Sequence, residues 1–177
     1  ASRDEHIPQR LFAKSVNFGL MYGMGAFRLA RDSDLTLAEA EHFIKAYFEQ
    51  FPGVRAYLDT SIETAKTQGY LETLFGRRRY FPGLVEGAGY QARQAAEREA
   101  INMPIQGTAA DILKIAMINL AAALTAGGYR ARMILQVHDE LVLEVPDDEL
   151  DRVAPLVIET MEAAFTLDAP LVADAQV

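Results

Sequence analysis

Four chemically distinctive side chains recur at intervals of four residues near the start of the chain. They are two cations followed by two aromatic rings: Arg10, Lys14, Phe18 and Tyr22. Residues four apart on an α-helix form one slowly drifting stripe, so the spacing predicts a helix from about Pro8 to Tyr22. Cations suit phosphates and flat rings suit sugars and bases, so such a stripe could hold a nucleotide. By spacing alone, an ordinary amphipathic helix with a solvated basic end is the simpler interpretation.

The rest of the chain reads as helices interrupted by two short hairpins. A capping box beginning at Thr36 predicts the start of one helix, and Gly69 predicts the end of the next. Pro104 should kink or interrupt a long helix that begins near Tyr90. The expected helices are about 26–31, 36–50, 54–68, 90 onward, 109–126 and 147–165, and the expected strands are 70–74, 79–81, 132–137, 141–146 and 170–177.

Composition narrows the class of protein without excluding nucleic acid. The chain has 177 residues, half of them hydrophobic and a quarter charged, and no cysteine. This is typical of a soluble protein with a substantial core, and we expect no membrane-spanning run and no signal peptide. The net charge of −8 is uneven, because residues 139–177 hold eleven acidic residues and one basic residue. A protein binds a polyanion with a local surface, so the acidic total does not argue against DNA.

Two motifs give the chain a specific resemblance. Lys14-x-x-Asn17-Phe18-Gly19-x-x-Tyr22-Gly23 resembles motif B, the fingers-helix motif of family A DNA polymerases, the bacterial DNA polymerase I family. Residues 136–140, Gln-Val-His-Asp-Glu, resemble the palm motif C of the same family. The segments 69–78 and 102–111 also resemble family sequence, and all four occur in the family's order. The resemblance extends from about Arg10 to the end.

The resemblance implies a fold and an activity. It implies an α+β fold, with a helical fingers segment (1–85) followed by a palm part (86–177) whose antiparallel hairpin, packed on long helices, bears the catalytic aspartate. It implies template-directed DNA synthesis with Mg²⁺, with a DNA primer–template and a dNTP as partners. The parent protein would be a monomeric, cytoplasmic polymerase of bacterial or phage origin, without a membrane partner.

The resemblance also implies roles for individual residues. Arg10 and Lys14 would contact the triphosphate, with Lys14 as a candidate proton donor to pyrophosphate, while Phe18 would pack on the incoming sugar and base. Tyr22 would lie by the templating base. For each aromatic residue taken alone, packing in the core is the default interpretation.

The hairpin motif receives its roles in the same way. Asp139 would be a metal ligand, Glu140 a nearby carboxylate and His138 a neighbour of the primer terminus. Taken alone, an aspartate in a turn is more often a capping residue.

Three further side chains repeat the four-residue spacing: Arg98, Asn102 and Gln106. All can donate to minor-groove acceptors, which occur in every base pair, and the resemblance assigns them to the primer–template. Asn102 could also cap the helix at the Pro104 break. The run from Arg77 to Arg79 stays open between a solvated charge run and a phosphate contact.

The family's second metal-binding aspartate, in motif A, has no counterpart before Arg10. We therefore expect that the 177 residues do not polymerise by themselves, because one acidic ligand holds two cations poorly. One alternative is a non-catalytic module that binds nucleotide or primer–template. Another is a helical structural domain without a role in nucleic-acid chemistry.

Overall fold

The computed structural model describes residues 7–84 and 88–177, and it divides into two compact units, 1–105 and 106–177. The division falls within the longest helix, α5 (Tyr90–Ala126). Helices dominate both units and each unit adds one two-stranded antiparallel sheet, so the predicted α+β class is confirmed. The assignment of 1–85 to fingers and 86–177 to palm is a functional division and stays a prediction.

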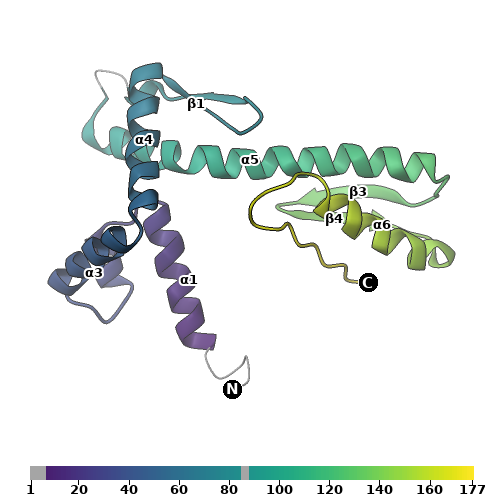
Figure 1. Cartoon of the computed structure of the whole chain (residues 1–177), viewed down its shortest axis with the longest axis horizontal. Coiled ribbons are helices and arrows are strands. Elements are labelled where there is room, and N and C mark those ends of the chain that lie inside the picture. The colour runs from purple at the N-terminus through teal and green to yellow at the C-terminus, as the bar shows by residue number, and fades with distance from the viewer. Residues whose placement is uncertain (1–6, 85–87) are drawn as a thin grey trace. The chain divides into compact units, whose positions relative to one another are not determined.

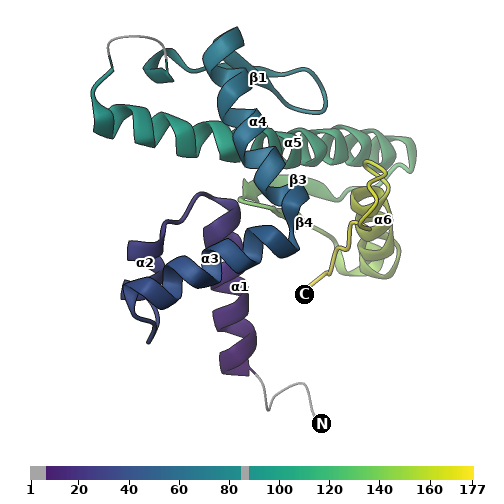
Figure 2. The ribbon, with the colours of Figure 1, turned by 60° about the vertical axis from the view of Figure 1, so that its left-hand side comes forward.

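The first unit begins with three helices that share a small core. They are α1 (Ile7–Met21), α2 (Ala26–Arg31) and α3 (Leu37–Gln50), and they lie side by side in Figures 1 and 2. Val16 and Leu20 of α1 pack with Leu29 and Ala40. The capping box at Thr36 is confirmed, because its hydroxyl accepts the Glu39 backbone N–H while the Glu39 carboxylate accepts the Thr36 N–H.

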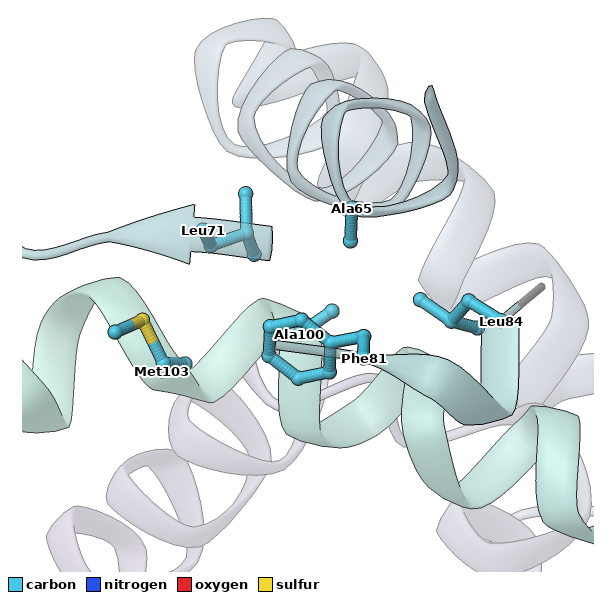
Figure 3. Packing of buried hydrophobic residues seen from close by; sticks show 6 residues of the cluster. All are labelled: Ala65, Leu71, Phe81, Leu84, Ala100 and Met103. Atoms are coloured by element: carbon cyan, nitrogen blue, oxygen red, sulfur yellow. The ribbon is translucent and has the colours of Figure 1, made fainter. Parts of the chain in front are cut away.

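A second core joins a helix, a hairpin and the start of α5. Helix α4 (Pro52–Gln68) ends at Gly69, whose φ of +77° is the left-handed geometry that glycine adopts without strain. Strands β1 (Tyr70–Glu72) and β2 (Arg78–Tyr80) follow, and then a 3₁₀ turn, η1 (Pro82–Leu84). Figure 3 shows the side chains that fill the space between these elements: Ala65, Leu71, Phe81, Leu84, Ala100 and Met103.

The second unit is a hairpin packed against two helices. It comprises the rest of α5, β3 (Arg132–Val137), β4 (Glu140–Glu144), the 3₁₀ turn η2 (Asp147–Glu149) and α6 (Leu150–Glu162). Figure 1 shows β3 and β4 beside α6. One face of the hairpin packs on a core of Leu120, Leu124, Ala131 and Val153. The hairpin is therefore held by residues from both neighbouring helices.

A buried carboxylate fixes the base of this hairpin. Glu149 accepts the backbone N–H groups of Arg130 and Ala131 and the Nε–H of Arg130, all at 3.0–3.1 Å. Burial raises the pKa of Glu149, but the backbone and side-chain hydrogen bonds from Arg130 and the one from Ala131 outweigh it, so the pKa lies below its ordinary value. Nothing in the spacing of the sequence predicted this contact.

Four sequence-based expectations need correction. Helix α5 continues through Pro104 without interruption, since losing one backbone hydrogen bond does not outweigh those of a long helix packed on both units' cores. The first turn of the expected helix 147–165 is the 3₁₀ turn η2, and α6 ends at Glu162. Residues 170–177 form no strand, and among the described residues no third strand pairs with β3 or β4. By length and composition, α5 is also apolar enough to cross a membrane, although Leu120 and Leu124 pack in a core.

Candidate nucleotide and metal site

The predicted stripe on α1 forms a continuous stack on the exposed side of the helix. The rings of Phe18 and Tyr22 are stacked, with centroids 6.1 Å apart and planes 25° apart. Lys14 Nζ lies 5.8 Å from the Phe18 centroid, and the Phe18 side chain is 45% exposed. Val16 and Leu20 bury the opposite side of the helix. The default interpretation that Phe18 is a core residue is therefore wrong, and its ring is open to a ligand.

The cations of the stripe are also open to solvent. Arg10 and Lys14 are both exposed, and no ion pair with a carboxylate involves either of them within residues 7–84 and 88–177. An anion approaching this side of α1 therefore meets two positive charges that no neighbouring acid neutralises.

Two glycines shape the end of the stripe. Gly23 has φ +78°, its N–H donates to Leu20 O, and the Met24 N–H donates to Gly19 O at 2.8 Å. This pair of bonds is the Schellman arrangement that ends a helix at a left-handed residue. A Cβ at Gly19 would lie 2.1 Å from Met24 Cε, so the methionine side chain packs directly over Gly19. Both glycines of the motif thus have a local structural reason.

A cavity of about 940 Å³ opens beside the end of α1. Its lining includes Gly23, Phe27, Arg28, Phe48 and Arg98. Phe27 on α2 is 76% exposed, which is unusual for a phenylalanine that has core positions beside it. The sequence analysis missed Phe27 and Arg28, although a short helix with an aromatic residue on its polar side was a readable signal.

The predicted DNA-contacting residues differ in exposure. Arg98 is exposed and lines the cavity, whereas Asn102 is half-buried, and its Oδ1 is buried without a hydrogen-bond partner. The Tyr57 hydroxyl donates to Ile101 O at 2.8 Å and ties α4 to this stretch of α5. Burial raises the pKa of Tyr57, so the hydroxyl stays protonated as that bond requires. Asn102 does not cap a break, because α5 has none there.

Gln106 belongs to the second unit and is exposed. Its predicted action together with Arg98 and Asn102 stays a prediction.

The second unit presents Asp139 at the tip of its hairpin. Val137 pairs with Glu140, which leaves His138 and Asp139 as a two-residue turn. His138 has φ +54° and is the one described non-glycine residue with positive φ, a geometry that a tight hairpin turn requires at its first central position. Gln136 Nε2 donates to His138 O at 2.5 Å. The turn is thus braced from within its own strand.

The three residues of the tip are all exposed: His138, Asp139 and Glu140. Two adjacent carboxylates therefore project from a packed sheet, as the motif predicts. The part of the chain that the structure describes gathers no group of three or more His, Cys, Asp or Glu side chains that could hold a metal ion. The tip therefore offers hard oxygen ligands but does not enclose an ion.

An α+β fold that presents one cation-and-aromatic stack and one carboxylate-tipped hairpin has the parts expected of a nucleotidyl-transfer domain. Comparison with known proteins makes this specific. Residues 3–177 match the family described as DNA polymerase family A. The chain belongs to that family.

The relatives agree with the family assignment. The chain is 52% identical over 162 residues to DNA polymerase I of Streptococcus pneumoniae, with 92% of the chain and 18% of that protein covered. It is 53% identical over 162 residues to the thermostable DNA polymerase I of Thermus filiformis, with 92% of the chain and 19% of that protein covered. The chain thus spans about a fifth of the length of these relatives.

A solved structure shows the same fold. It is described as the POL domain of Pol1 from M. smegmatis in complex with DNA primer-template and dNTP, and it matches with a TM-score of 0.87 and 46% identity. The match covers 95% of this chain and 30% of that one.

Proposed function

We propose that this chain supplies part of the fingers and part of the palm of a template-directed DNA polymerase. The reaction adds a deoxynucleotide to a primer 3′-hydroxyl and releases pyrophosphate. The observation that carries the proposal is the exposed Lys14–Phe18–Tyr22 stack, which lies on the motif that resembles the family's fingers helix. The relatives are bacterial proteins, which favours a bacterial cytoplasmic parent.

The stack suggests how the chain holds an incoming nucleotide. Arg10 and Lys14 contact the triphosphate, since charge-assisted hydrogen bonds to phosphate are strong and neither cation is paired with a carboxylate. Phe18 packs against the sugar and base. Lys14 is also positioned to donate a proton to the departing pyrophosphate, because an ammonium group beside a leaving phosphate stabilises its charge.

The tip of the second hairpin fits part of a magnesium site. Asp139 and Glu140 are exposed oxygen ligands of the kind that Mg²⁺ prefers. When bound, a pair of Mg²⁺ ions activates the primer hydroxyl and stabilises the pyrophosphate charge. Asp139 is the ligand, Glu140 is a supporting carboxylate, and His138 lies next to the primer end. Arg98, Asn102 and Gln106 bind the minor groove of the primer–template.

A complete site needs a carboxylate from outside these residues, because the described residues gather no third metal ligand. We propose that the 177 residues alone do not polymerise. This also supports a second candidate function, a non-catalytic module that binds nucleotide or primer–template. Such a module would bind DNA with strong salt dependence and would extend no primer.

Single-nucleotide extension of a labelled primer–template with Mg²⁺ tests the proposal. We expect no extension by the chain alone and restored extension when the preceding fingers and palm segment of a family A polymerase is added. Asp139→Ala should abolish the restored activity, whereas the exposed Asp168→Ala should leave it unchanged. Extension by the chain alone would contradict the incomplete site. A mixture that extends equally well with Asp139→Ala would contradict the metal role.

A further inference from the structure

The β1–β2 hairpin presents a second stack of cations and rings, separate from the one on α1. The register pairs Tyr70 with Tyr80 and Glu72 with Arg78, so these four side chains share one face. The two tyrosine rings have centroids 5.6 Å apart, and the Arg78 guanidinium lies 4.5 Å from the Tyr70 centroid. Tyr80 is 65% exposed. The face is therefore an open aromatic surface with a cation at its side.

The opposite face of the hairpin is anchored. Leu71 and Phe81 are buried in the core shown in Figure 3. The turn is braced by Thr73, whose hydroxyl accepts the backbone N–H groups of Phe75 and Arg77. Because the buried face holds the hairpin in place, the exposed face is preorganised and would lose little freedom on binding.

The hairpin is basic in a chain that is acidic overall. Residues 70–80 contain three arginines and one glutamate, against a net charge of −8 for the whole chain. Arg78 pairs with Glu72 and Arg79 with Glu99, both at 2.6 Å, but all four side chains are about half exposed. Exposed ion pairs contribute little, so phosphate groups can compete for both guanidinium groups.

We propose that this hairpin is a binding site for single-stranded DNA. Phosphates pair with the guanidinium groups of Arg78 and Arg79, and a base stacks on Tyr80. A duplex hides the faces of its bases, so the ring selects unpaired strands. An acidic peptide would use the arginines but would leave the tyrosine surface without a role. The inference goes beyond the polymerase proposal and can fail independently of it.

Fluorescence anisotropy with a labelled oligothymidylate of about twelve nucleotides tests the site in this chain. We expect the double variant Arg78→Gln/Arg79→Gln to bind about tenfold more weakly, with a smaller salt dependence by about one unit of slope. The matched control removes two exposed arginines from the second unit, Arg132→Gln/Arg152→Gln, and should stay within twofold of the wild type.

A second variant separates stacking from charge. Tyr80→Ala should weaken binding at least about fivefold with an unchanged salt slope, and Tyr80→Phe should restore it, because the ring alone carries stacking. Thermal melts of each variant check that the fold is retained. Equal losses in both double variants, or no loss with Tyr80→Ala, would overturn the site. Displacement of the oligonucleotide by poly-glutamate at equal charge, with Tyr80→Ala having no effect, would show an acidic-peptide site instead.

Discussion

The rigidity of the Asp139 hairpin depends on one buried side chain of α5, and Leu120→Ala tests this dependence. Leu120 is 0% exposed and lies in the core beneath the hairpin. Truncating a fully buried leucine costs about 2.7–5 kcal/mol. Partly exposed neighbours such as Leu156 can collapse into the gap, so we take about 3 kcal/mol from the lower part of that range.

Hydrogen–deuterium exchange of peptides covering β3 and β4 measures the effect locally. A loss of about 3 kcal/mol speeds exchange through cooperative opening about 100-fold, since each tenfold change corresponds to about 1.4 kcal/mol. The matched control is Ile118→Ala, two residues away on the same helix and 68% exposed. It should change exchange no more than about twofold. Equal acceleration in both variants, or less than fivefold in Leu120→Ala, would refute the packing argument.

Three further predictions concern the stripe and the hairpin base. Lys14→Ala should weaken dNTP binding at least about tenfold in a titration, while the exposed Lys114→Ala should not. Gly23→Ala should lower the free energy of unfolding by about 1–2 kcal/mol in a urea titration, because φ +78° strains an alanine. The lowered pKa of Glu149 means that its stabilisation is complete above the ordinary value of 4.5 and is lost as the pH falls through the folded value. Glu149→Gln should therefore flatten the fall in urea midpoint between pH 7 and pH 3, and an unchanged fall would contradict the assignment.

Local signals in the sequence predicted the helices and hairpins well. The capping box at Thr36 and the glycine at 69 set helix ends through contacts within a few residues, so the pattern was sufficient. The same holds for the α1 stripe, whose four-residue period is a property of the helix itself. Pro104 was misjudged because the cost of one lost hydrogen bond was weighed without the packing that supports a long helix on both sides.

Contacts between distant residues could not be read from the sequence. Glu149 meets Arg130 and Ala131 across nearly twenty residues, and only the fold brings them together. The exposed face of Tyr70 and Tyr80 depends on strand register, which the run of arginines alone does not reveal. The strand expected at 170–177 failed for a related reason, since a strand needs a partner edge and the described residues provide none.

The central claim is that Asp139, held at the hairpin tip, is a magnesium ligand for nucleotidyl transfer. The most direct test grafts these 177 residues into a family A polymerase in place of its own corresponding segment. Single-turnover insertion of one nucleotide is then measured against Mg²⁺ concentration. We expect insertion by the chimaera, and a loss of at least about a thousandfold with Asp139→Ala, equivalent to about 4 kcal/mol of transition-state stabilisation. Insertion by the Asp139→Ala chimaera within tenfold of the parent rate would contradict the account.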